Sequence, residues 1–257
     1  MLIFILSLII SYILTSLFIP TVINNGYNFG LLDQPSRRKQ HDKAKVRLGG
    51  IAIVFSFLLT FGLINIFLKF NDTFFITYPL YLGTILSCGF LLFLIGIGDD
   101  VYNFSPLIRL LIQIIIAIIT WSNGIRIESL RFDLIGDSFI PLSLNSTISL
   151  IITSFWIVGI INAFNWLDGL DGQLIGLNII YSSTLLYFCL INNMDGLFLL
   201  LIINIGCSLS FLRYNFFPSK ILMGDGGAYF IGYFIASLSI IIPTNDGFLN
   251  VFTPILI

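Results

Sequence analysis

Two aspartates and two asparagines recur every three residues in the stretch NAFNWLDGLDGQ, which lies between long apolar segments. They are Asn162, Asn165, Asp168 and Asp171. On an unbroken helix each step of three residues turns about 300°, so the first and last side chains would point to opposite sides. Gly169 and Gly172 provide a break that would let all four point inward. Oxygen ligands of this kind favour Mg²⁺ or Mn²⁺ over zinc.

A pair of adjacent carboxylates, Asp99 and Asp100, ends an apolar segment in GIGDDVYNFSPLIRLLIQ. Adjacent carboxylates raise each other's pKa unless a cation offsets the repulsion, so one could act as a base or both could surround a divalent metal. Pro106 suits the first position of a helix, on which Arg109 and Gln113 would share one face. An arginine there either extends to the membrane interface or binds phosphate, and the nearby acidic pair favours phosphate.

Two further polar stretches are NFFPSKILMGDGGAYFIG and RRKQHDKAKVRLGG. The first has a glycine-rich turn that opens a helix, where free N–H groups and the helix dipole favour phosphate, and Asp225 could hold a metal that bridges it. The second is basic, which indicates either contact with lipid headgroups or binding of an anionic substrate. Arg47 and His41 are the candidates for substrate binding, although a lone histidine such as His41 is more often an interface residue than a catalyst.

These stretches interrupt a chain that is otherwise strongly apolar. Of its 257 residues, 57% are hydrophobic and 10% are charged, and the mean hydropathy is +1.02. Soluble domains carry about 25% charged residues, so the composition excludes an ordinary soluble domain and predicts a membrane protein. The net charge of −1 says nothing about nucleic-acid binding, and no basic stripe in the sequence suggests it, so no nucleic-acid partner is expected. The three cysteines lie in apolar runs without metal or disulfide spacing.

The apolar runs predict an all-α integral membrane protein, a polytopic helical bundle with eight complete transmembrane helices and a truncated ninth. The eight runs are 1–23, 48–69, 74–97, 106–122, 147–164, 173–191, 196–213 and 226–243, and the ninth begins near 248. The first run lacks a basic n-region, so it is interpreted as a transmembrane helix rather than a signal peptide. Turn residues between alternating segments predict a small hairpin near 124–146, on the outer side.

The basic residues predict the orientation of this bundle. Six of the twelve Lys and Arg residues lie in the connection after the first run, which places that connection in the cytoplasm and the N-terminus outside. The same topology gathers five carboxylates at the cytoplasmic face, namely Asp99, Asp100, Asp168, Asp171 and Asp225. Because a carboxylate near hydrocarbon is costly unless it faces protein, water or a cation, this gathering predicts a functional site.

Taken in order, DQPSRRKQH…RLGGIAI, GDDVYNFSPLIRLLIQ, NAFNWLDGLDG and NFFPSKILMGDGG resemble the polyprenyl-phosphate N-acetylhexosamine-1-phosphate transferases. These belong to glycosyltransferase family 4 and are relatives of phospho-N-acetylmuramoyl-pentapeptide transferase. The resemblance covers nearly the whole chain and implies a single transmembrane transferase domain over residues 1–257. The implied reaction moves a sugar-1-phosphate, by default N-acetylhexosamine-1-phosphate, from a UDP-sugar to polyprenyl (undecaprenyl) phosphate and releases UMP.

The resemblance also implies where the reaction occurs and with what cofactor. The expected cofactor is Mg²⁺, with Mn²⁺ as the alternative, and the partners are the UDP-sugar, the polyprenyl phosphate and the lipid bilayer. The expected location is the bacterial cytoplasmic membrane, with the active site on its cytoplasmic face, and a homodimer is compatible with it. The reaction would be the first membrane step of a cell-surface glycan pathway.

Matching of motifs assigns roles to individual residues. The catalytic candidates are Asp99, Asp100, Asp168 and Asp171, of which the first is assigned to the lipid phosphate, as base or, in an older proposal, as nucleophile. The metal candidates are Asn165 and Asp225. The substrate-binding candidates are Arg109, Asn215, Leu222, Asn162, Arg47 and His41, with Asn215 and Leu222 near the uracil. Arg109 stands where the family usually has Lys, which replaces a point charge with a planar fork.

The chain departs from the family pattern in three places. Gln173-Leu174 stands where relatives often have Leu-Ala, and Ala228 stands where Ser is usual. The family also has a His-rich cytoplasmic loop after the ninth helix, whereas this chain ends within that helix, so we expect the chain alone to be poorly active.

Two other function classes compete with the transferase. A secondary transporter would have polar sites near the bilayer midplane in repeated halves. The sequence GIGD at 96–99 also matches the GxGD pattern of intramembrane aspartyl proteases, which need a second Asp that shares a proton with the first. The gathering of polar stretches at one membrane face favours the transferase.

Overall fold

The computed structural model describes residues 2–33, 44–69, 79–133 and 139–242. These residues form eight helices: α1 (Leu2–Asn28), α2 (Gly49–Lys69), α3 (Pro79–Tyr102), α4 (Pro106–Ser122), α5 (Ser146–Leu167), α6 (Gln173–Ile191), α7 (Asp195–Asn215) and α8 (Gly224–Ile241). Seven of them are long and apolar enough to cross a membrane, and α4 is a shorter apolar helix. The predicted all-α polytopic bundle is therefore confirmed, whereas the predicted count of eight spans is not, because the run at 106–122 forms only the shorter α4. The ninth run lies outside the described residues.

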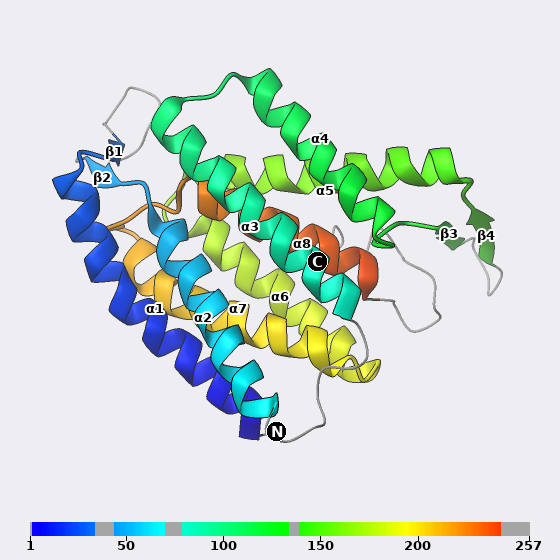
Figure 1. Ribbon diagram of the computed structural model, residues 1–257, viewed down its shortest axis with the longest axis horizontal. Helices are drawn as coiled ribbons and strands as arrows, with labels where there is room; N and C mark the ends of the chain where they lie inside the picture. Colours follow the sequence, from blue (N-terminus) through cyan, green and yellow to red (C-terminus); the bar gives the residue numbers. More distant parts are fainter. Residues whose placement is uncertain (1, 34–43, 70–78, 134–138, 243–257) are drawn as a thin grey trace.

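Two short antiparallel ladders lie at opposite ends of the bundle (Figure 1). Strands β3 (Ser129–Asp133) and β4 (Phe139–Ser143) pair as the predicted hairpin. Strands β1 (Leu32–Asp33) and β2 (Lys45–Val46) were not predicted. Val46 of β2 also forms a parallel bridge with Ile221, so β2 lies beside the segment that leads into α8.

Helix α8 forms the centre of the bundle and contacts α2, α3, α5 and α6. Its side chains are buried along nearly its whole length, as expected for a helix that is apolar on all sides. Glycines let the neighbouring backbones approach its first turn. A Cβ atom added at Gly96 of α3 would lie 2.5 Å from the backbone N and Cα of Gly226, and one added at Gly50 of α2 would overlap Gly227. The end of α3 is thereby held against the start of α8.

Small and polar residues join the other helices, as is usual where helices pack in a membrane. The buried face of α1 includes Ser7, Ser11 and Thr15, and Ser11 approaches Gly206 of α7 closely. Between α6 and α7, Asn178 donates to Ser208 at 2.8 Å and accepts from Asn204 at 3.1 Å. These contacts hold α6 against α7. The start of α6 and the end of α7 lie beside the candidate site.

Candidate functional site

The first turn of α8 is capped by two carboxylates that come from other elements. Asp100, in the last turn of α3, accepts from the backbone N–H groups of Asp225 and Gly226 at 3.1 and 3.3 Å. Asp168, which follows α5, accepts from the N–H groups of Met223 and Gly224 at 3.2 and 2.9 Å. The glycine-rich turn therefore presents its N–H groups to aspartates of the same chain, whereas the sequence predicted a phosphate at this place. The positive end of the α8 dipole stabilises the two carboxylates.

Asp168 combines these hydrogen bonds with partial burial. Burial raises the pKa of the Asp168 carboxyl to about 7, although the N–H groups of Gly224 and Met223 and the charge of Arg47 act in the opposite direction. Gly172, three residues after Gly169, has a positive φ of 75°, and the chain turns between α5 and α6 at this point. The predicted break in the helix is therefore present, and it brings Asp168 against the start of α8.

Asp99 is held by three donors. Its Oδ1 accepts from the N–H of Phe104 at 2.9 Å, and its Oδ2 accepts from Nη1 of Arg109 and from the hydroxyl of Tyr229, both at 3.0 Å. Asp99 is buried, whereas the side chain of Arg109 is 30% exposed. The structure thus pairs Arg109 with Asp99, and it adds the hydroxyl of Tyr229, which was not predicted from the sequence, as a second side-chain donor to Asp99.

Arg47 joins two of the carboxylates. Its Nη2 lies 2.6 Å from Oδ1 of Asp225, and its Nε lies 3.2 Å from Oδ1 of Asp100. The same Oδ1 of Asp225 accepts from the side-chain amide of Asn165 at 2.6 Å. Asp225 also interacts electrostatically with Asp99. We refer to Asp99, Asp100, Asp168 and Asp225 together as the carboxylate cluster.

Three of the predicted site residues have partners that hold connections together. Asp171 accepts from Lys45 and from the backbone and side chain of Ser219. Asn215 accepts from the N–H of Gly172 at 3.1 Å and donates to the carbonyl of Ile221 at 2.9 Å. The third, Asn162 on α5, donates to Oε1 of Gln113 on α4.

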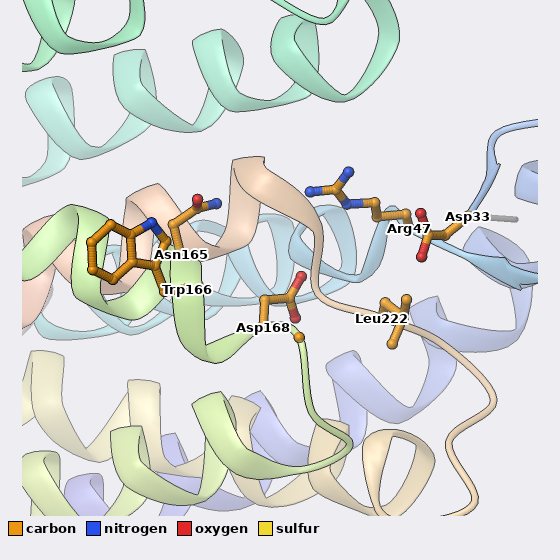
Figure 2. Close-up of a pocket in the computed structure, with 7 residues that line it drawn as sticks. Asp33, Arg47, Asn165, Trp166, Asp168 and Leu222 are labelled. Carbon is orange, nitrogen blue, oxygen red and sulfur yellow. The ribbon is translucent and has the colours of Figure 1, made fainter. Parts of the chain in front are cut away.

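A pocket of about 200 Å³ lies beside the carboxylate cluster. It is lined by Asp33, Arg47, Asn165, Trp166, Asp168, Gly169 and Leu222. Figure 2 shows that these residues come from β1, from the segment after β2, from the end of α5 and from the segment before α8. The structure therefore brings together four predicted site residues, Arg47, Asn165, Asp168 and Leu222, at one pocket. His41 lies outside the described residues.

The sequence analysis did not select two of the lining residues, Asp33 and Trp166. Asp33 directly precedes the polar connection after the first helix, which is a signal that could have identified it. Trp166 carries no such signal, because an aromatic residue inside an apolar helix normally packs in the core or faces lipid. In the structure, Trp166 is 82% exposed and lines the pocket.

Fold and site together define a polytopic helical membrane protein with an acidic, arginine-containing pocket at one end of its bundle. Comparison with known families gives a match to glycosyl transferase family 4 over residues 82–243. The match covers the segment from α3 to α8, which carries the whole carboxylate cluster. The chain belongs to glycosyl transferase family 4.

Individual relatives agree with this assignment. The chain is 34% identical over 238 residues to the probable undecaprenyl-phosphate N-acetylglucosaminyl 1-phosphate transferase of Bacillus subtilis, covering 93% of this chain and 62% of that protein. It is 29% identical to the undecaprenyl-phosphate alpha-N-acetylglucosaminyl 1-phosphate transferase of Thermotoga maritima, over 93% of this chain and 65% of that protein. It is also 29% identical to the phospho-N-acetylmuramoyl-pentapeptide-transferase of Staphylococcus saprophyticus, over 93% and 75% of the two chains. The chain thus spans a little under two thirds of the first two relatives.

Proposed function

We propose that this protein transfers a sugar-1-phosphate, N-acetylhexosamine-1-phosphate, from a UDP-sugar to polyprenyl phosphate and releases UMP. The names of the Bacillus and Thermotoga relatives support the class of reaction and the N-acetylglucosamine unit. The observation that carries the proposal is the pocket in which Arg47, Asn165 and Asp168 meet. A lipid phosphate requires a site at the end of membrane helices, and a nucleotide donor requires access to water. The side chain of Arg47 is 35% exposed at the pocket, and a charged group at the end of a membrane bundle favours water over lipid.

The chemistry of the donor set fits Mg²⁺, with Mn²⁺ as the alternative. The carboxylate cluster is paired, among the described residues, with two guanidinium groups, those of Arg47 and Arg109. Because Asp168 has a pKa of about 7 and is partly protonated at neutral pH, the four carboxylates would exceed the positive charge by between one and two, an excess that a divalent cation would offset. Asp225 and Asn165 would hold the ion through oxygen atoms, the ligands that Mg²⁺ prefers. Within the described ranges, no group of three or more His, Cys, Asp or Glu side chains that could hold a metal ion by itself is found.

The proposed reaction is a direct in-line displacement. An oxygen of the lipid phosphate attacks the phosphorus that carries the sugar, the bond from that phosphorus to the bridging oxygen of the diphosphate breaks, and UMP leaves with that oxygen. When bound, the cation would neutralise charge on the diphosphate. Arg47 would bind phosphate oxygens through its planar fork. Both act by positioning the reactants and offsetting negative charge, which is what phosphoryl transfer requires.

Asp99 is the proposed base that takes the last proton of the acceptor phosphate, which must be largely dianionic to attack. Because Arg109 and Tyr229 both donate to Oδ2 of Asp99, the acceptor must displace one of these donors or approach Oδ1. The exposed part of Arg109 makes it the donor that a lipid phosphate can draw away. A nucleophilic role for Asp99 would leave an aspartyl-phosphate enzyme, and isolation of that species would exclude direct attack.

We further propose that the pocket faces the cytoplasm from the bacterial inner membrane. Strand β2, which begins with Lys45, and Arg47 directly after it lie at the same end of the bundle as the pocket, which agrees with the positive-inside rule. Family membership favours the transferase over the transporter and the protease that the sequence left open. A homodimer stays a prediction.

The test is release of UMP by the purified full-length protein with polyprenyl phosphate, Mg²⁺ and a panel of UDP-sugars. We expect Asp225→Asn and Asp100→Asn to reduce release by about 10²–10³-fold, the size typical for loss of one electrostatic group at a reacting centre. Asp195→Asn is the matched control, because Asp195 is exposed and lies far from the site. It begins the 21-residue helix α7, whose opposite end, about 30 Å away, reaches the site. Undiminished release by Asp225→Asn, or UMP without lipid-linked sugar phosphate, would overturn the proposal.

A further inference from the structure

The guanidinium of Arg47 lies between the two carboxylates that are best placed to receive a cation. It bridges Asp225 and Asp100, which are 7% and 5% exposed, while its own side chain is 35% exposed. Arg47 thus reaches two buried carboxylates from the open side, where it also lines the pocket. A dissolved cation that approached these carboxylates through the pocket would meet Arg47 first.

The contacts of Arg47 are incompatible with metal coordination by the same atoms. Oδ1 of Asp225 accepts from both Arg47 and Asn165 at 2.6 Å, so its two lone pairs are engaged by N–H donors. Asn165 turns its NH₂ group toward Asp225, so its carbonyl oxygen points away from this carboxylate. Oδ1 of Asp225 is therefore occupied by two N–H donors, one of them from the guanidinium of Arg47.

We propose that Arg47 and a divalent cation exchange at Asp225 and Asp100. Arg47 neutralises the two carboxylates when the cation is absent, and binding of the cation releases the guanidinium into the pocket, where it can contact a diphosphate. The proposal rests on the proposed function for the identity of the cation, and it adds an order of events: the cation binds before Arg47 becomes available to the anionic donor.

The local structure permits this movement without disturbance of the fold. Arg47 directly follows β2, whose position is fixed by the pairing with β1 and by the bridge from Val46 to Ile221. The backbone N–H groups of Gly49 and Gly50 donate to Leu222 and Met223 at 2.9 and 2.7 Å. These bonds hold the main chain on both sides of Arg47, so only its long side chain needs to swing.

Linkage makes the exchange measurable in both directions. If Arg47 and the cation compete, removal of the guanidinium must tighten the binding of the cation, and an anion that draws Arg47 into the pocket must do the same. Coupling between two such sites is typically about 5–150-fold. The effect does not depend on catalysis, so it can be measured without donor or acceptor.

The first experiment titrates the full-length protein in detergent with Mn²⁺ alone, followed by electron paramagnetic resonance. We expect Arg47→Gln to bind Mn²⁺ about tenfold or more tightly than the wild type, and Arg47→Lys to lie between them because it keeps the charge but loses the fork. Arg109→Gln is the matched control, because it removes the guanidinium on Asp99 while leaving Asp100 and Asp225 paired with Arg47. Equal tightening by both glutamine variants would indicate general charge repulsion and would overturn the exchange.

The second experiment measures the accessibility of Arg47 in the wild-type protein, so it does not depend on the folding of a variant. Modification by phenylglyoxal, mapped by mass spectrometry, should increase at Arg47 when Mn²⁺ is added. Arg126 is the internal control, because it is exposed and pairs with Glu128 beside the β3–β4 hairpin. Unchanged or reduced labelling of Arg47 would contradict the exchange.

The outcomes separate this inference from the proposed function. Saturable Mn²⁺ binding that Asp225→Asn abolishes but Arg47→Gln leaves unchanged would overturn the exchange and leave the metal-dependent transferase intact. Absence of Mn²⁺ binding in the wild type and in every variant would overturn both the metal site and the exchange.

Discussion

Asp171 offers the sharpest separation between a catalytic and a positioning role. Its carboxylate accepts from Nζ of Lys45 at 3.1 Å, from the N–H of Ser219 at 2.9 Å and from the Ser219 hydroxyl at 2.6 Å. The side chains of Lys45 and Asp171 are 12% and 16% exposed. These contacts join β2, the turn between α5 and α6, and the segment between α7 and α8. We predict that Asp171 acts by holding these three connections, and therefore the pocket wall, in register.

The expected stability losses follow from these contacts. Asp171→Asn keeps an acceptor but loses the charge that strengthens all three bonds, and hydrogen bonds to charged groups contribute about 1.5–3 kcal/mol each at most. We expect a loss of about 2–3 kcal/mol, equivalent to a fall in melting temperature of roughly 4–12 °C. Lys45→Gln should cost about 1–2 kcal/mol, since the pair is mostly but not fully buried. The double variant should lose about 1 kcal/mol less than the sum, because the two residues share one interaction.

The pH dependence of this contribution has a defined sign. Burial alone would raise the pKa of the Asp171 carboxyl, but hydrogen bonds from Ser219 and the charge of Lys45 outweigh it and hold the pKa below its ordinary value. A lowered pKa means that the stabilisation is complete above the unfolded-state value of about 3.9 and is lost only as the pH falls below it. The difference in stability between the wild type and Asp171→Asn should therefore stay constant from about pH 5 to pH 8.

The assay combines thermal unfolding in detergent with steady-state release of UMP. A positioning role predicts that Asp171→Asn, Lys45→Gln and Ser219→Ala lower turnover by similar factors, and that Lys45→Arg restores most of it. If Asp171→Asn removed turnover at unchanged stability while Lys45→Gln stayed fully active, Asp171 would be catalytic, as the sequence motif implied, and the reasoning from its contacts would be refuted.

Two further predictions concern the start of α8. Gly96→Ala should separate α3 from α8 and reduce both melting temperature and turnover, because the added Cβ would lie 2.5 Å from the backbone of Gly226. Gly83→Ala on the same helix is the control: its added Cβ meets nothing within 4 Å, so it should change neither quantity. Asp168→Asn should flatten the pH dependence of stability. Because burial raises the folded-state pKa of Asp168 to about 7, the wild type loses stability as the pH rises from about 4 to 7. If thermal melts of Asp168→Asn kept the wild-type slope across that range, this assignment would be contradicted.

The helices and their polar ends could be predicted from the sequence because both depend on local pattern. Runs of about twenty apolar residues specify spanning helices, and the alternation of successive spans determines which helix ends share a face, while the positive-inside rule indicates which face is cytoplasmic. That reasoning grouped five aspartates at one end of the bundle, and the structure places four of them in one cluster. The β3–β4 hairpin followed from turn residues in the same way.

The pairing of individual side chains could not be predicted, because it depends on contacts between segments far apart in the chain. Lys45 and Arg47 are two residues apart in a basic run, yet Lys45 pairs with Asp171 and Arg47 with Asp100 and Asp225. The β1–β2 pairing that separates their roles consists of two residue pairs, too few to produce a periodic signal.

The position of Arg47 also bears on how an acidic site can persist at the end of a membrane bundle. A carboxylate removed from water must be paired or neutralised, and breaking such a pair leaves an uncompensated charge that costs several kcal/mol. Asp100 and Asp225 are almost fully buried in the described structure, and Arg47 neutralises them from the pocket side. A cation that replaced Arg47 would keep Asp100 and Asp225 neutralised. The exchange from arginine to metal would therefore leave no unpaired carboxylate near the bilayer. An arginine with one face open to the pocket meets this requirement better than a fully buried one, because only an accessible guanidinium can be exchanged.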